Sequence, residues 1–171
     1  MSPHPPWLAY MVETLHAVGL RGVVLKWFAS YLADRNQVVS VNGVHSSSRV
    51  VNKGVPQGSV LGPVLFSIYT MPIQQIVQKY PLSYHKYADD IQLYVSYNPK
   101  NPDSVTSAVN ILQNCIHDIK EWMSQNYLKL NESKTDLINI MSPYNHYVCR
   151  KVSVVLDGCT IITPSHVVKN L

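Results

Sequence analysis

Apolar residues recur every three or four positions along the first part of the chain, which is the spacing of one face of an α-helix. The first set ends at Gly19, a residue type that stops helices, and the second spans residues 21–32, ahead of the polar Asp34-Arg35-Asn36. The two sets are Leu8, Met11, Val12, Leu15 and Val18, then Val24, Leu25, Phe28 and Leu32. The pattern therefore predicts two short helices in succession.

The pattern then changes to two β-rich runs, over residues 37–41 and 49–52. Between them stand Asn42-Gly43 and the serine cluster of residues 46–48, which are residue types of turns and loops. These runs predict a hairpin with a long loop.

The stretch Gly54-Val-Pro-Gln-Gly-Ser-Val-Leu-Gly-Pro63 has no regular period. Three glycines and two prolines at this density do not fit inside a helix or a central strand, so the stretch predicts a loop. Residues 64–79 begin almost wholly apolar and later carry three glutamines, before Pro81. This segment predicts one buried helix.

Two aromatic-rich runs, residues 82–87 and 91–97, flank Ala88-Asp89-Asp90. Two short strands on either side of a few turn residues are typical of a tight β-hairpin, which here has an acidic tip.

The strongest helical pattern follows, with apolar residues stepping by four and three positions from Val105 to Met123. Asp103 or Ser104 is the predicted cap, after Pro102. The residues expected to face the sheet are Val109, Leu112, Ile116 and Ile119.

Two further β elements are predicted near the end of the chain. They are a strand over residues 137–140 and a hairpin of residues 151–156 with 160–162 around Asp157-Gly158. Because strands and helices alternate in the order that a sheet with covering helices requires, the fold class is α+β. The hairpin of residues 84–97 would pair into an antiparallel sheet backed by the long helix and by the helix after Pro63.

Composition adds limits to this picture. The 171 residues are 46% hydrophobic and 14% charged, which excludes disorder as the main state and indicates one domain. So few charges also suggest a piece of a larger core, because little remains to coat a free-standing domain. The net charge of +4 permits polyanion partners, but its basic residues are scattered singly and identify none.

The same composition bears on location. The three cysteines show no CxxC spacing and indicate reduced thiols. The sequence shows neither a signal peptide nor a run of about 18 apolar residues. We therefore expect an intracellular protein, in nucleus or cytoplasm, with no membrane association.

Asp89 and Asp90 are the first candidates for chemistry. Adjacent strand residues point to opposite faces, so two neighbouring carboxylates reach one site only where the backbone turns. Two acids placed close together repel each other, and burying them among residues such as Tyr87, Ile91 and Tyr94 is unfavourable unless a cation compensates. Mg²⁺ is a common compensating ion and is held by one or two carboxylates together with substrate phosphates. A solvated Asp-Asp turn without function is the alternative.

The loop of residues 54–63 matches neither the phosphate-binding Gly-Lys-Ser/Thr pattern nor the GxGxxG dinucleotide pattern. Its glycines allow the backbone to approach a flat or bulky group, and Gln57 offers an amide that both donates and accepts hydrogen bonds. A plain loop entering a helix is the alternative.

Taken together, three segments resemble the reverse transcriptases of non-LTR (LINE-type) retrotransposons. They are the loop of residues 54–63, Tyr87-Ala-Asp-Asp90 and Leu130-Asn-Glu-Ser-Lys-Thr135. The resemblance extends from about residue 8 to residue 171 and includes the Trp27-Phe28, Tyr31-Leu32 and Arg35 positions.

The resemblance implies the partial palm of a right-hand polymerase, acting on an RNA template, a DNA primer and deoxynucleotides. It implies that Asp89 and Asp90 are the catalytic and metal-binding residues, with Asp89 the stronger ligand and Asp90 the supporting one, and that two Mg²⁺ ions act in intact relatives. The residues that it assigns to substrate are Pro56, Gln57, Gly58, Tyr87 and Lys134. The loop would lie under the incoming nucleotide and the templating base, and Lys134 beside the nucleotide.

The chain also departs from the family pattern. The family bridges its two metal ions with a further aspartate on an upstream strand, but no acidic residue precedes Glu13 here. We expect residues 1–171 to be a partial domain truncated at both ends, with an unstructured start over residues 1–6 and without a thumb.

Two interpretations remain open. One is a nucleotidyl-transferring polymerase fragment that is inactive alone, and the other is a degenerate, non-catalytic retroelement remnant that retains nucleic-acid or protein binding. The sequence leaves the oligomeric state undetermined.

Overall fold

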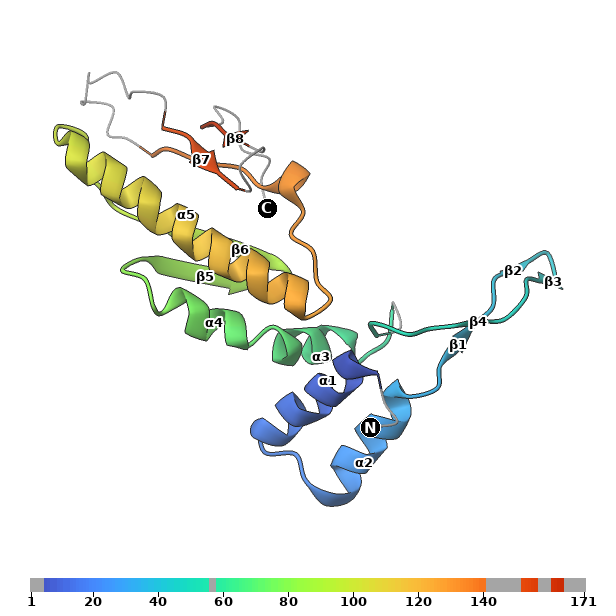
Figure 1. Cartoon of the computed structure of the whole chain (residues 1–171). Coiled ribbons are helices and arrows are strands. Elements are labelled where there is room, and N and C mark those ends of the chain that lie inside the picture. Colours follow the sequence, from blue (N-terminus) through green and yellow to red (C-terminus); the bar gives the residue numbers. More distant parts are fainter. Residues whose placement is uncertain (1–4, 56–57, 141–151, 157–160, 165–171) are drawn as a thin grey trace. The chain divides into compact units, whose positions relative to one another are not determined.

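The computed structural model describes residues 5–55, 58–140, 152–156 and 161–164. The chain divides into two compact units, Met1–Met71 and Pro72–Leu171 (Figure 1). Within the described ranges, the fold combines helices with short antiparallel ribbons, so the α+β class is confirmed.

The first unit is built around three helices, α1 (Pro6–Ala17), α2 (Gly22–Leu32) and α3 (Gly62–Tyr69). Proline is favoured in a first helical turn, and α1 begins at Pro6, the last residue of the start predicted to be unstructured. Gly19 has a φ of 103°, which explains why the chain turns there. Both predicted helices are confirmed.

Helix α1 packs against α2 and α3 and supplies most of the first unit's core. The Tyr10 and Tyr69 rings meet edge to face with centroids 5.0 Å apart. The buried residues of this core are Trp7, Leu8, Met11, Leu15, Leu32 and Leu65.

The predicted hairpin is present, but its long loop is not. Strand β1 (Asn36–Gln37) pairs with β4 (Arg49–Val50), and between them β2 (Ser40–Val41) pairs with β3 (Val44–His45). Asn42 and Gly43 both have positive φ, as the type I′ turn of a tight hairpin requires. The loop therefore closes on itself as a second ribbon, and residues 36–50 are all exposed.

The single helix predicted over residues 64–79 is two helices, α3 and α4 (Pro72–Val77). The reason is Pro72, because a proline disfavours the α conformation of the residue before it. The Thr70 hydroxyl donates 2.8 Å to the carbonyl oxygen of Phe66 at the end of α3.

In the second unit, the helices α4 and α5 (Pro102–Gln125) pack against the hairpin of β5 (Ser83–Tyr87) and β6 (Asp90–Tyr94). Figure 1 shows α5 running along this hairpin, with β7 on its other side. The cluster between them consists of Ile73, Ile76, Val77, Cys115 and Ile119, with Tyr84, Ile91 and Leu93 of the hairpin packed against it.

The predicted sheet-facing stripe of α5 is confirmed in part. Of the four expected residues only Ile119 belongs to the cluster, where it is joined by Cys115, Trp122 and Met123. Val109, Leu112 and Ile116 are half-buried. Because α5 also packs against β7, its apolar residues serve two neighbours, and the periodicity alone does not show which residues face the hairpin.

Two predictions near α5 were wrong. The helix is capped by Asn101, whose Oδ1 accepts from the backbone N–H of Asp103 at 3.0 Å and of Ser104 at 3.4 Å. Residues 137–140 form no strand; Leu137 makes one isolated bridge with Pro164. A short 3₁₀ helix, η1 (Glu132–Lys134), precedes it.

The last predicted hairpin is confirmed in a shorter form, as β7 (Val154–Val155) paired with β8 (Ile161–Ile162). Its turn, Asp157-Gly158, lies outside the described residues. Every named strand of the described ranges belongs to a two-stranded ribbon.

Candidate active site

The tip of the β5–β6 hairpin carries both candidate aspartates. Tyr87 pairs with Asp90, so Ala88 and Asp89 form a two-residue turn. Ala88 has a φ of 52° and Asp89 does not have positive φ, which fits a type II′ turn rather than I′. The tight hairpin with an acidic tip is therefore confirmed, with Asp89 in the turn and Asp90 as the first residue of β6.

The two faces of this hairpin differ in their surroundings. Tyr84, Ile91 and Leu93 lie on the face that packs against the helices, whereas Tyr87 is 76% exposed. Asp89 and Asp90 are also exposed. The carboxylates therefore meet water, and we find no burial of the acidic pair among aromatic residues of the kind that the sequence suggested.

Lys86 lies on the covered face, cross-strand from Ile91. Burial lowers the pKa of its ammonium group, since the charged form loses hydration there. Because side chains alternate along a strand, Lys86 and Tyr87 point to opposite faces of the hairpin. Lys86 is therefore a partly buried cation on the face opposite to the one that carries Tyr87 and Asp90.

The donor set at the tip fits a hard divalent cation. Carboxylate oxygens are the ligands that Mg²⁺ takes, and one or two carboxylates with water and substrate phosphates suffice to hold it. Among the described residues, no group of three or more His, Cys, Asp or Glu side chains could hold a metal. The described tip therefore offers two carboxylates, Asp89 and Asp90, and no third.

The glycine-rich loop belongs to the first unit. Gly54 and Gly58 have φ values of 78° and 77°, a conformation that favours glycine. The Arg35 guanidinium donates hydrogen bonds to the carbonyl oxygens of Leu32 and Gly54, and it lies 5.5 Å from the centroid of the Trp7 ring. Arg35 thereby holds the start of the loop, whose Pro56 and Gln57 lie outside the described residues.

Lys134 is the last residue of η1 and is exposed. Its turn is formed by backbone hydrogen bonds from Lys134 N to Asn131 O and from Thr135 N to Glu132 O, both 3.1 Å. Glu132, at the start of the same turn, forms an ion pair with Lys120 of α5, with 2.6 Å between Oε1 and Nζ.

The sequence profile described as "Reverse transcriptase (RNA-dependent DNA polymerase)" matches residues 7–160. The chain belongs to the reverse transcriptase family. This match and the chain's similarity to proteins of transposable elements confirm the predicted membership.

Among its relatives, the chain is 38% identical over 116 residues to the "Probable RNA-directed DNA polymerase from transposon BS" of Drosophila melanogaster. It is 31% identical over 134 residues to the "RNA-directed DNA polymerase from mobile element jockey" of Drosophila funebris. The matches cover 62% and 75% of this chain but only 12% and 14% of those proteins. No solved structure matches the chain significantly.

The residues that match the family's motifs fall into both units. Tyr87, Asp89 and Asp90 share one hairpin, Lys134 lies in the same unit, and Gly58 lies in the other. Arg35 was part of the family resemblance, but the contacts that Lys120 and Arg35 make with these motifs were not predicted. They join residues 12 and 19 positions apart, and no local pattern marks them. No helix of the described ranges is both long and apolar enough to cross a membrane.

Proposed function

We propose that this reverse transcriptase chain supplies palm residues of an RNA-directed DNA polymerase and that Asp89 and Asp90 hold a divalent metal ion, Mg²⁺, at the point of nucleotidyl transfer. The observation that carries the proposal is the two-residue turn, which puts both carboxylates at one exposed tip. The family match and the relatives named as RNA-directed DNA polymerases support the same chemistry.

Bound there, Mg²⁺ supplies charge neutralisation of the triphosphate and activation of the primer hydroxyl. Asp89 is the stronger ligand and Asp90 the supporting one. Tyr87, on the outward face beside Asp90, contacts substrate, as do Pro56, Gln57 and Gly58 of the loop. Lys134 binds the nucleotide through its ammonium group. The partners in this proposal are an RNA template, a DNA primer and deoxynucleotides.

We also propose that the 171-residue chain alone extends no primer. Asp89 and Asp90 would be the carboxylates that hold metal at this site, and the two ions used by intact relatives would carry four positive charges. With two carboxylates, one of these ions would depend on phosphates and water for its ligands. Among the described residues, no third acidic side chain joins these two in a group that could hold a metal. Reacting groups would then be held less accurately, and a misplacement of about 1 Å can lower the rate on the order of a hundredfold.

Metal binding is tested by following backbone amide resonances of the chain during a titration with Mg²⁺. We expect the shifts to concentrate at residues 87–91 and to disappear in Asp89→Ala. Asp103→Ala is the matched control, since Asp103 is an exposed aspartate at the start of α5 and should leave the shifts unchanged. Equal shifts in the parent and in Asp89→Ala would overturn the metal assignment.

A primer-extension assay with primed RNA, Mg²⁺ and deoxynucleotides tests the activity. We expect no extended product from this chain. Extension that Asp89→Ala abolishes would show that two carboxylates are sufficient.

The alternative function, a non-catalytic remnant that binds nucleic acid or protein, is favoured if the hairpin binds no metal. Because counterion release governs phosphate contacts, any binding of the primed RNA should then weaken steeply with salt. Salt-independent binding would point to a protein partner.

A further inference from the structure

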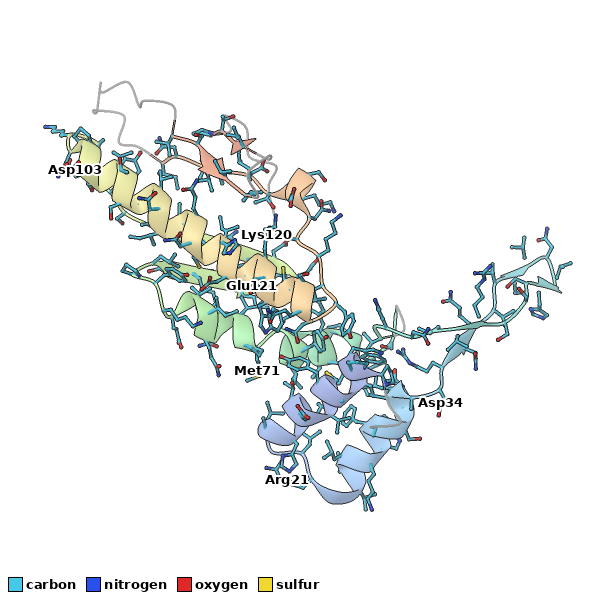
Figure 2. The ribbon with its side chains drawn as sticks, in the orientation of Figure 1. Arg21, Asp34, Met71, Asp103, Lys120 and Glu121 are labelled. Carbon is cyan, nitrogen blue, oxygen red and sulfur yellow. The ribbon has the colours of Figure 1, made fainter. Side chains whose placement is uncertain are left out.

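Lys120, labelled on the long helix in Figure 2, forms an ion pair with Glu132. This pair joins the helix to the turn that carries Lys134. The Lys120 Nζ donates to Glu132 Oε1 at 2.6 Å and to the carbonyl oxygen of Leu156 at 3.5 Å. The two side chains are 22% and 29% exposed, so the pair is partly shielded from water. Shielding strengthens such a pair relative to one on the open surface.

The η1 turn has no apolar anchor of its own, because none of its residues is buried. Its place in the unit is set by contacts on either side. Ahead of it, the backbone N–H of Leu128 donates to the carbonyl oxygen of Met123 at 2.8 Å. Beyond it, the Tyr97 hydroxyl donates to Asn139 Oδ1 at 2.7 Å. Between these two contacts, the Lys120–Glu132 pair attaches η1 itself to α5.

Glu132 and Lys134 are the first and last residues of one three-residue turn. Hydrogen bonds within the turn hold its residues together. One of them runs from the Thr135 hydroxyl to the carbonyl oxygen of Asn131 at 2.9 Å. Fixing Glu132 therefore fixes the backbone from which Lys134 extends into solvent.

We propose that Lys120 and Glu132 are positioning residues that hold the η1 turn against α5 and so present the Lys134 ammonium to the triphosphate of a nucleotide. This inference rests on the proposed function, in which Lys134 binds the nucleotide. It adds two residues, neither of which touches substrate. Lys120 acts through Glu132, and Glu132 acts through the turn that it shares with Lys134.

The experiment measures the affinity of the full chain for thymidine triphosphate with Mg²⁺ by calorimetric titration. We expect Lys120→Met to weaken binding about three- to fivefold, the equivalent of a partly exposed ion pair. Lys120→Arg keeps the pair and should bind as the parent does. The reversed pair, K120E/E132K, should recover most of the lost affinity. Lys129→Met, which removes the same charge from an exposed lysine of the same segment, is the matched control.

Coupling distinguishes positioning from a general loss of charge. If Lys120 acts only through Lys134, K120M/K134M should bind no more weakly than Lys134→Met alone. Amide hydrogen exchange of the same variants should show faster exchange at Ser133 and Lys134 in Lys120→Met, with α5 unchanged.

The outcomes separate the two proposals. No binding by the parent, or no loss in Lys134→Met, would overturn the nucleotide role of Lys134 and this inference with it. A loss in Lys134→Met without one in Lys120→Met would overturn this inference alone. This inference would also be overturned if Lys129→Met lost as much nucleotide affinity as Lys120→Met. The effect would then come from the lower net charge.

Discussion

A hydrogen bond between Tyr80 and Asp118 is the clearest case in which one residue alters the chemistry of another. The Tyr80 hydroxyl donates 2.7 Å to Asp118 Oδ2, across 38 positions of sequence. The carboxylate acceptor, with some burial, raises the pKa of Tyr80 to about 12. Cys115, one turn earlier on α5, is fully buried, and this burial raises the pKa of its thiol to about 11.

This hydrogen bond predicts a loss of stability at alkaline pH. A phenol whose pKa is raised in the folded state stabilises the fold below its unfolded pKa of 10, and that contribution is lost as pH rises from 10 to about 12. The free energies of unfolding of the parent and of Tyr80→Phe, measured in urea, should therefore become equal as pH rises through this range. Asp118→Asn should return the ultraviolet titration of Tyr80 towards pH 10. An unchanged titration in Asp118→Asn would contradict the assignment of the carboxylate as the cause.

At the scale of elements, the ends of helices and hairpins depend on a few backbone positions. The hairpin tip requires Ala88 at a φ of 52°, a conformation that costs an L-residue roughly 1–2 kcal/mol. The long helix requires Asn101, which satisfies two of its first N–H groups. In both elements one side chain or one dihedral angle decides where regular structure begins.

The turn predicts an unusual response to β-branched substitution. Ala88→Val should lower the free energy of unfolding by about 1–2 kcal/mol, because a β-branched side chain fits poorly at positive φ. Ala88→Gly is the control and should stay within about 0.5 kcal/mol of the parent, since glycine relieves the strain but gains freedom in the unfolded chain. A stabilised valine variant in urea unfolding would show that strand propensity outweighs the turn.

Asn101→Ala should lower the free energy of unfolding by about 1 kcal/mol. Without the side-chain oxygen, the backbone N–H groups of the first turn lose their hydrogen-bond acceptor. Asn110 is exposed in the middle of the same helix, so Asn110→Ala should cost nothing. Both are measured by urea unfolding. Equal losses at the two positions would mean that Asn101 is not the cap.

At the scale of the whole molecule, each of the two units has its own core. The first gathers leucines and Trp7 from α1, α2 and α3, and the second gathers residues of α4 and α5 over the β5–β6 hairpin. Within the described residues, each cluster draws its buried side chains from one unit. Each unit can therefore be tested by its own substitutions.

Replacing a core side chain by alanine in either unit should lower the free energy of unfolding by about 2–5 kcal/mol. The removed methyl groups leave a cavity that the surrounding residues do not fill. Leu15→Ala and Ile119→Ala are the test pair, since both side chains are buried, one in each core. Amide hydrogen exchange should show faster opening confined to the unit that carries the substitution. Uniform acceleration across both units by either variant would indicate a single cooperative core.

The sequence by itself determined the local elements and the family. The apolar spacing of α1, α2 and α5, the strands around Asp89-Asp90 and the loop glycines were all legible, because periodicity and turn chemistry depend on residues close together in the chain. The sequence-based prediction was wrong where two neighbouring patterns indicated different structures. Pro72 broke a helix that its apolar pattern continued, and Asn42-Gly43 closed a loop that the serines had suggested was long.

Only the tertiary structure decided which face of α5 is covered, that residues 137–140 form no strand, and that Asp89 and Asp90 stand in water. The same holds for the partners of the motifs, Arg35 at the loop and Lys120 at the Lys134 turn. The physical reason is that burial and ion pairing depend on neighbours brought together by folding. A helical period shows that a face is apolar, but which neighbour covers it follows only from the packing of the other elements.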